Sequence, residues 1–337
     1  MATGRTSLAV DVGGTKVIVA IVDESGSVRA RVTMSTHDPE PGFSARLVDR
    51  VEGRPTAADR LVQRIATAAA ALVHDTRADP VGAGFATTGH VDAAAGRVLH
   101  SGLVAGWSGF PLRDAFRRAL LEAGLPDLPV AVDNDGHAMA LAEARFGAAR
   151  GHQHAICVAV GTGVGGGLIL DGHLYRGHRG LAGLVGHSNI GYQGRRCQCG
   201  KRGCLEAYAA GPRIVDEYRR LSRAARAGER LVAPLRLQDV CARAEAGDTN
   251  ADLAIQRGGQ FLGAGLASLA NALNPSVIVI GGGVLNAGPR WFDATREAIY
   301  ARVRHTVAFG LEVMPAALGS DAVVVGAGLM GLIKAQR

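Results

Sequence analysis

Long apolar runs are missing from this 337-residue chain. The N-terminal segment MATGRTSLAVDVGG lacks the apolar core of a signal peptide, and IATAAAALV (65–73) and PSVIVIGGGV (275–284) are too short to cross a bilayer. Secreted and membrane-spanning classes are therefore disfavoured, and we expect a cytoplasmic protein. With 47% hydrophobic and 20% charged residues, the composition is that of a globular chain with one large or two medium-sized domains.

Cysteine is also scarce, with five in the chain. In a reducing cytoplasm, clustered cysteines indicate metal binding or catalysis before disulfides. Cys157 and Cys241 stand alone in apolar patterns and are interpreted as core thiols. The other three lie in GLVGHSNIGYQGRRCQCGKRGCLE (183–206), together with one histidine and one glutamate. The net charge of +7 comes mostly from scattered arginines, so RRCQCGKR (195–202) is the one dense basic patch.

The hydrophobic periodicity predicts an α/β protein built from two similar halves. Residues 7–36 alternate as strands of an antiparallel meander with a glycine turn, and residues 155–175 repeat this strand, glycine turn and strand. The pattern also predicts strands at 81–89, 276–284 and 311–316, and helices at 55–73, 112–124, 136–147, 205–227, 236–246, 251–273 and 288–304. Two halves that open alike indicate a duplicated unit with a ligand cleft between the copies.

Three glycine turns follow predicted strands. In DVGGTK (11–16), two glycines could supply the positive φ of a plain hairpin turn, but a carboxylate, a hydroxyl and an ammonium around exposed N–H groups suit a magnesium-bound phosphate. GTGVGGG (161–167) contains GxGxxG, yet the LILDG that follows predicts a strand and not the helix of a dinucleotide site. GGGV (281–284) follows a buried strand and could bind an anion or a nucleoside. Together the turns predict a bound triphosphate.

A set of motifs now resembles a known family, the ROK family of sugar kinases and sugar-responsive repressors. The motifs are DVGGTK, DND before an Ala-rich helix, GTGVGGG, GH with CxCGxxGCLE ten residues later, and NPSVIVIGGG, in this order. The resemblance implies the actin-like ATPase fold, with two RNase H-like domains closing on ATP and a sugar, a structural zinc, and a homodimer or homotetramer. On this basis we expect domains at 1–133 and 134–320, with a C-terminal helix (321–337) that packs back on the first domain.

The cysteine stretch predicts a metal site within residues 187–204. Cys197, Cys199 and Cys204 form C-x-C-x4-C, and His187 lies ten residues before the first of them. Three thiolates and one imidazole make a closed tetrahedral zinc site of structural type. Three unrelated buried thiols are one alternative. An RNA-gripping zinc knuckle is another, but knuckles need aromatic stacking platforms and Tyr192 is the one aromatic residue nearby; we expect no nucleic-acid and no membrane partner.

The resemblance also assigns roles to the sugar-binding and catalytic residues. Asp135 matches the general base that accepts the proton of the attacking sugar hydroxyl, and Asn134 would hold a neighbouring hydroxyl. Without the resemblance, an Asp or Asn before an Ala-rich helix is most simply an N-cap. His187 would present its other side to the sugar, so that zinc fixes its ring, and Glu206 would bind near the anomeric end.

ATP-binding residues follow from the same resemblance. Asp11 would orient the shell of a Mg²⁺ ion. The turns would hold the phosphates and the adenosine, through Gly13, Gly14, Thr15, Lys16, Gly161, Thr162, Gly163, Gly281, Gly282 and Gly283.

The sequence departs from the family pattern at three positions. Leu184 stands where kinases of the family usually carry a glutamate that binds the sugar, Leu103 where an asparagine is usual, and His137 where NDxN has its second asparagine. Sugar hydroxyls that lose polar partners to leucine cost about 1–3 kcal/mol each. These changes make the identity of the sugar uncertain.

Three functional classes compete to explain these observations. The first is an ATP-dependent, glucokinase-like kinase acting on the primary hydroxyl of a hexose or hexose-like ring, with an amino-hexose (kanosamine or N-acetylmannosamine) or a C7-cyclitol as alternative substrates. The second is a repressor, for whose winged-helix domain the ten residues before Asp11 leave no room. The third is a non-catalytic sugar sensor, suggested by Leu184 and Leu103.

Overall fold

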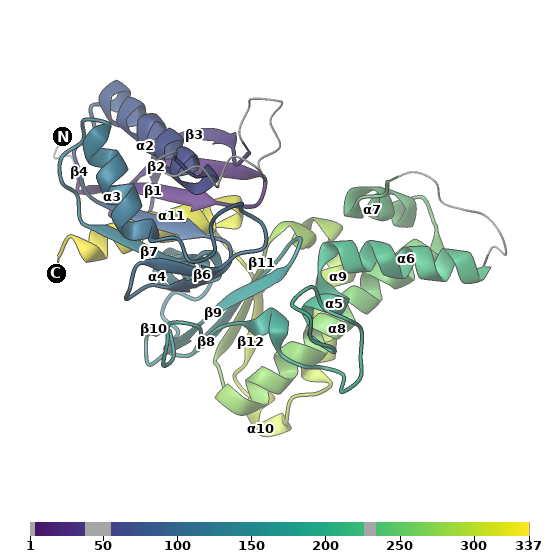
Figure 1. Ribbon diagram of the computed structural model, residues 1–337. Helices are drawn as coiled ribbons and strands as arrows, with labels where there is room; N and C mark the ends of the chain where they lie inside the picture. The colour runs from purple at the N-terminus through teal and green to yellow at the C-terminus, as the bar shows by residue number, and fades with distance from the viewer. Residues whose placement is uncertain (1–3, 38–54, 226–233, 337) are drawn as a thin grey trace. The chain divides into compact units, whose positions relative to one another are not determined.

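The chain forms two compact units, shown in Figure 1. The structure is a computed structural model that describes residues 4–37, 55–225 and 234–336. The contacts assign Met1–Phe146, Leu174–Ala182 and Asp321–Arg337 to the first unit, and Gly147–His173 and Gly183–Ser320 to the second. Among the described helices, none combines the length and the apolar character needed to span a membrane.

The first unit is built on a five-stranded sheet with the order β3-β2-β1-β4-β7. Its strands are β1 (Thr6–Val12), β2 (Lys16–Asp23), β3 (Val28–Ser35), β4 (Pro80–Thr87) and β7 (Val130–Asn134). The first three form the expected antiparallel meander, and β4 and β7 run parallel to β1. Val12 pairs with Thr87, which pairs with Asn134, so the ends of three parallel strands share one edge of the sheet. This edge carries the predicted catalytic residues.

Helices cover both faces of this sheet. On one face, α2 (Ala57–Thr76) and α3 (Leu112–Glu122) enclose a core that includes Phe85 and Trp107. The indole N–H of Trp107 donates to Oγ1 of Thr87 at 2.9 Å, so this buried donor has a hydrogen-bond partner where β4 ends. On the other face, α4 (Asp135–Phe146) and α11 (Ala322–Lys334) pack against the strands. The layers therefore anchor the site-bearing strand ends from both sides.

The second unit repeats this sheet, with the order β10-β9-β8-β11-β12. Its strands are β8 (Ala155–Val160), β9 (Val164–Leu170), β10 (His173–Tyr175), β11 (Val277–Gly281) and β12 (Glu312–Pro315). Here β8 and β9 form the antiparallel hairpin, and β11 and β12 run parallel to β8. The predicted duplication of an α/β unit is confirmed, and the architecture is that of the actin-like ATPase fold.

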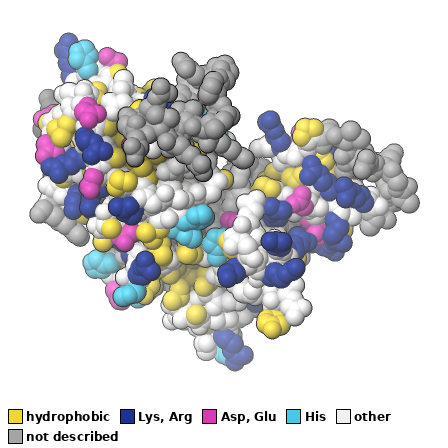
Figure 2. Space-filling model, viewed as in Figure 1, with side chains coloured by type: hydrophobic (Ala, Val, Ile, Leu, Met, Phe, Trp, Pro, Cys, Tyr) yellow, Lys and Arg dark blue, Asp and Glu magenta, His cyan; other side chains and the backbone are white. Residues whose placement is uncertain are grey.

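Helices of the second unit share one large core with its sheet. They are α5 (Glu206–Ala209), α6 (Gly211–Ala225), α7 (Leu237–Glu245), α8 (Thr249–Leu273) and α9 (Pro289–Tyr300). Small elements that the sequence did not indicate are β5 (His90–Asp92), β6 (Arg97–His100) and α10 (His305–Ala308). Figure 2 shows many Lys and Arg side chains where α6 lies. The sequence of this helix includes Arg213, Arg219 and Arg220, each of which is partly exposed.

The predicted helix 205–227 is wrong as a single element. It is split into α5 and α6 at Ala210, whose backbone is extended. Pro212 explains the break, because in a continuous helix it would remove a hydrogen bond and clash with the preceding turn, whereas it is tolerated in the first turn of α6. The last two residues of the predicted helix lie outside the described residues.

The expected domain boundary at 133/134 also differs from the observed division. Helix α4 groups with the first unit because Ala138 and Leu141 pack in one cluster with Ala327 and Met330 of α11. A side chain at Gly326 would overlap the backbone of Ala138, so the two helices lie very close together. The C-terminal residues 321–337 group with the first unit as well.

Candidate functional site

Asp11 lies near the end of β1, beside the first glycine turn. Burial and the charge of Asp135 raise the pKa of Asp11 to about 7, and the Lys16 ammonium only partly offsets them. Two neighbouring carboxyl groups make each other harder to ionise, and a bound cation would relieve the repulsion between the carboxylates. This is the electrostatic setting that a Mg²⁺ shell requires.

The DVGGTK turn closes the β1–β2 hairpin without left-handed backbone. The N–H of Gly13 donates to the carbonyl of Lys16 at 2.9 Å, and both Gly13 and Gly14 lie outside the positive-φ region. The alternative of a plain hairpin turn in which these glycines supply positive φ is therefore not supported. An added Cβ at Gly14 would lie 3.4 Å from Cβ of Leu103, which is an ordinary van der Waals contact. Leu103, 53% exposed, thus lies against the predicted phosphate turn.

Asp135 begins α4, immediately after β7. Oδ1 of Asp135 and Oδ1 of Asn134 each accept the N–H of Gly136 at 2.8 Å, so the N-cap interpretation is correct for this junction. Burial raises the pKa of Asp135 to about 6, although the Gly136 N–H and the positive charge of His137 act against it. A carboxylate with a pKa slightly below neutral pH is well suited to accept a proton.

The side chain of Asn134 forms hydrogen bonds with backbone groups. Its Nδ2 donates to the carbonyl of Gly89 at 2.7 Å while its Oδ1 caps α4. The side chain therefore ties the loop after β4 to the start of α4. The sugar contact predicted for Asn134 would have to use the remaining hydrogen of its amide or the second lone pair of its Oδ1.

The four predicted metal ligands come together in the second unit. The ligand atoms of His187, Cys197, Cys199 and Cys204 all lie within 4.8 Å of one another. The Sγ atoms of Cys199 and Cys204 are 3.7 Å apart, and Sγ of Cys197 lies 3.9 Å from Nδ1 of His187. The ligand atoms of a tetrahedral zinc site would lie about 3.5–3.8 Å from one another. The four side chains therefore suit zinc in their chemistry and in their spacing.

Local backbone structure explains this convergence. The N–H of Cys197 donates to the carbonyl of Lys201 at 2.8 Å, which closes a tight loop around Cys199. Gly200 and Gly203 have φ of +87° and +78°, which only glycine adopts at low cost. Burial and the neighbouring thiols raise the pKa of Cys204 to about 12, so a cation is needed to hold this sulfur as a thiolate.

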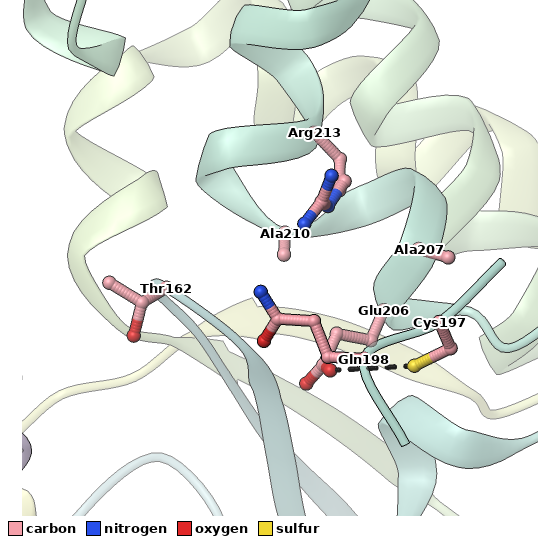
Figure 3. A pocket seen from close by; sticks show the side chains of 7 residues that line it. All are labelled: Thr162, Cys197, Gln198, Glu206, Ala207, Ala210 and Arg213. Carbon is pink, nitrogen blue, oxygen red and sulfur yellow. Dashed lines mark hydrogen bonds between the residues drawn. The ribbon is translucent and has the colours of Figure 1, made fainter. Parts of the chain in front are cut away.

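Glu206 joins this cysteine segment to the second glycine turn, a contact that the sequence did not indicate. Its Oε2 accepts the N–H of Val164 at 2.9 Å, and its Oε1 lies 3.7 Å from Sγ of Cys197 (Figure 3). A Cβ at Gly163 would lie 2.6 Å from Oε2 of Glu206, so a side chain at this position would displace that carboxylate. The metal segment and the predicted phosphate turn are thus mechanically linked.

The two glycine turns of the second unit lie next to each other. β9 begins at Val164, within GTGVGGG, and continues into the LIL that was predicted to be a strand, so no dinucleotide-type helix is present at this point of the described chain. Gly282 has φ of +91° and any side chain there would overlap the backbone of Val160. The N–H of Gly211 donates to the carbonyl of Gly161 at 2.9 Å, which places the start of α6 at the same turn.

Residues not predicted from the sequence line a small pocket beside this turn. Figure 3 shows Gln198 and Arg213 around it, together with Thr162 and Glu206. Gln198 lies between Cys197 and Cys199 in the sequence, and Arg213 lies in the first turn of α6. The C-x-C spacing could have pointed to Gln198, but no motif marks Arg213.

The basic patch is partly used inside the protein. Arg195 donates to the buried Glu217 at 2.6 Å and lies over the ring of Tyr208 at 4.9 Å. Hydrogen bonds from Arg220 lower the pKa of Glu217 to about 2, despite its burial, with further help from Arg257 and Arg195. Arg195 therefore fixes the metal segment to α6 and α8, which leaves the RNA-binding alternative with less free charge.

The predicted residues thus form one group in each unit. Asp11, the 13–16 turn, Asn134 and Asp135 share one sheet edge of the first unit. The second unit holds the metal ligands, Glu206 and the turns at 161–163 and 281–283. Leu184, 39% exposed, directly precedes the short helix η1 (Val185–His187) that carries the metal-ligating histidine.

Known proteins with the same architecture are similar over nearly the whole chain. A glucokinase of Halalkalibacterium halodurans is 33% identical, covering 96% of this chain and 94% of its own. An N-acetylmannosamine kinase of Yersinia pestis is 32% identical over 82% of each chain. The crystal structure of a ROK family glucokinase from Streptomyces griseus with glucose and AMPPNP has a TM-score of 0.77 and 30% identity, covering 97% of this chain and 99% of its own.

These similarities agree with the motifs and with the duplicated sheet. The sequence profile described as the ROK family matches residues 7–332. The matched stretch includes every predicted site residue, from Asp11 to Gly283. The chain belongs to the ROK family.

Proposed function

We propose that this protein is an ATP-dependent carbohydrate kinase that transfers the γ-phosphoryl group to the primary hydroxyl of a hexose or hexose-like substrate. The observation that carries the proposal is the pair of interacting carboxyl groups, Asp11 and Asp135, beside the DVGGTK turn. Similarity to glucokinases over the whole chain supports the same conclusion.

Asp135 acts as the proton acceptor in this proposal. The sugar hydroxyl oxygen attacks the γ-phosphorus, the bond from that phosphorus to the β,γ-bridging oxygen breaks, and the hydroxyl proton passes to Asp135 as ADP departs. Phosphoryl transfer demands positioning and charge neutralisation more than a strong base, so a pKa of about 6 is adequate.

The phosphate groups are bound by the glycine turns in this proposal. Thr15 and Lys16 offer a hydroxyl and an ammonium, and the 161–163 and 281–283 turns offer backbone N–H groups without side-chain obstruction. Asp11 would hold Mg²⁺, which neutralises charge on the phosphates when bound. His187 and the three clustered cysteines would hold zinc, which keeps Glu206 and the adjoining turn in place.

A panel of candidate substrates tests the proposed activity. Purified protein with magnesium-ATP should release ADP with at least one of glucose, mannose, N-acetylmannosamine, glucosamine, kanosamine and C7-cyclitols. Absence of turnover with every compound would favour the sensor alternative. Light scattering on the same preparation tests the expected homodimer or homotetramer.

Leu184 favours a substrate other than glucose as a second candidate. An apolar side chain, 39% exposed, stands where a sugar-binding glutamate is expected, and the similarity to an N-acetylmannosamine kinase points to amino sugars. Leu184→Glu should raise kcat/KM for glucose about tenfold relative to the native substrate, because a regained hydrogen bond contributes about 1–1.5 kcal/mol. Leu184→Met is the matched control, since it keeps the site apolar; an equal change in both variants would contradict the role of Leu184.

The pKa values of the two carboxyl groups predict an acid limit to activity. Both groups must be ionised for catalysis, and both have a pKa raised above the ordinary value, to about 7 for Asp11 and about 6 for Asp135. We therefore expect kcat/KM to be full at pH 8 and to fall as the pH drops through 7 to 6. A profile flat down to pH 5 would show that neither carboxylate has this role.

A further inference from the structure

His137 lies at the centre of a buried polar network in the first unit. Its side chain is 2% exposed, and that of Asp133 is 1% exposed. Nδ1 of His137 lies 2.7 Å from Oδ1 of Asp133, and Nε2 lies 2.8 Å from the carbonyl oxygen of Ala182. Arg176 donates to the other carboxylate oxygen of Asp133 at 2.8 Å. Two residues of segment 174–182 are therefore bound to the end of β7 and the first turn of α4.

The hydrogen-bond partners define the protonation state of this ring. A carboxylate oxygen and a carbonyl oxygen are both acceptors, so both ring nitrogens must donate, which only the imidazolium can do. Burial alone would lower the pKa of His137, but the hydrogen bond and charge of Asp133 outweigh it and raise the pKa, against a smaller opposing effect of Arg176. The pKa of Asp133 is lowered, despite its burial, by His137 and Arg176.

This cation is close to the proposed base. His137 follows Asp135 by two residues in the first turn of α4, and its positive charge favours the ionised form of Asp135. The charged groups around the ring are Asp133 on β7, Arg176 on segment 174–182 and Asp135 on α4. The charge of Asp135 in turn raises the pKa of Asp11 on β1.

We propose that His137, as an imidazolium, is a positioning residue for phosphoryl transfer: it fastens segment 174–182 to the element that carries Asp135 and keeps that carboxylate ionised. The proposal rests on the proposed kinase function for its second part only. Two hydrogen bonds provide the fastening, one from His137 to the carbonyl of Ala182 and one from Arg176 to Asp133, while the bond from His137 to Asp133 holds the ring in place. The neutral asparagine expected from the NDxN pattern could not supply the charge.

His137→Gln tests both parts of this proposal. In the kinase assay, the acid limb of kcat/KM should move to higher pH by about half a pH unit or more, because Asp135 loses a favourable neighbouring charge. In limited proteolysis, trypsin should cut faster after Arg176 and Arg179, which lie in the segment that the variant releases. A purely structural role of His137 would lower the amplitude of the profile without moving the limb.

Arg176→Gln is the matched control. It removes one hydrogen bond to the same Asp133 but keeps His137, so cleavage after Arg179 should increase while the acid limb stays in place. A folded His137→Gln protein with an unmoved limb and the parental tryptic pattern would overturn the proposal.

A spectroscopic measurement on the unaltered protein does not depend on any variant folding or on kinase activity. At pH 7, the ¹⁵N chemical shifts of the His137 ring should show both nitrogens protonated. A neutral ring would overturn the proposal even if the protein proved not to be a kinase, and a protonated ring in an inactive protein would leave the fastening supported while the kinase proposal failed.

Discussion

Asp135→Asn should lower kcat by about 10²- to 10⁴-fold, the range typical for loss of a general base, and leave the protein folded. Asparagine keeps the shape of the side chain and can still accept the N–H of Gly136 through Oδ1, so the start of α4 is preserved. It cannot take the hydroxyl proton. Turnover measured at saturating ATP and sugar checks this, with Asp127→Asn as control, because Asp127 is a half-exposed surface residue paired with Arg117.

The same substitution should make the protein slightly more stable at pH 8. The pKa of Asp135 is raised from 3.8 to about 6 in the folded state, so the ionised carboxylate opposes folding; this cost develops between about pH 4 and pH 6 and is fully present at pH 8. Asparagine removes the cost, of the order of 1–3 kcal/mol. Thermal unfolding at pH 8 should therefore show a higher Tm for the inactive variant. An inactive variant with a clearly lower Tm would indicate a structural role for Asp135 instead.

The duplicated sheet could be predicted because each half repeats a local pattern. The alternation in 7–36 and in 155–175 directly reflects the antiparallel hairpins β1–β2 and β8–β9. The boundary between the units could not be predicted from local pattern, because it depends on the packing of α4 against α11, nearly two hundred residues later in the chain. Segment 174–182 was missed for the same reason, since its bonds to Asp133 and His137 join residues 43 and 45 positions apart.

The cluster of His187 with Cys197, Cys199 and Cys204 was predictable because its members lie within eighteen residues at a spacing typical of metal sites. The contact from Glu206 to Val164 was not, because it joins residues 42 positions apart and uses a backbone N–H that has no sequence signature. The alternative of a plain hairpin turn with positive φ at Gly13 and Gly14 could not be tested from the sequence, because glycine permits positive φ without requiring it.

Removal of the metal should cost the second unit much of its stability. Without a cation, three thiols and an imidazole would be packed within 4.8 Å of one another, and two of those thiols are buried. Structural zinc contributes to folding directly, by about 10–16 kcal/mol of binding free energy in isolated zinc-finger peptides. We expect Cys204→Ser to abolish stoichiometric zinc and to lower the Tm strongly, because Cys204 is a buried ligand that pairs with Asn189 in the backbone.

Elemental analysis and thermal unfolding of the same samples check this prediction. Cys241→Ser is the matched control, since that partly buried thiol lies on α7 and is absent from the cluster of ligand atoms; zinc content and Tm should remain near those of the parent. A parent protein that contains no zinc and unfolds at the same temperature as Cys204→Ser would contradict the metal site.

Catalysis should fail together with the metal, even under conditions in which the variant is still folded. Glu206 follows Cys204 by two residues, and its carboxylate holds the N–H of Val164 in the turn predicted to bind phosphate. Loss of the ligand at Cys204 frees Glu206, and with it the turn that carries Thr162 and Gly163. The KM for ATP should therefore rise in Cys204→Ser at a temperature well below its Tm, while Glu206→Gln, which keeps zinc and can still accept the same N–H, should retain the parental KM for ATP. An unchanged KM for ATP in a zinc-free, folded protein would show that the metal segment and the glycine turn are independent.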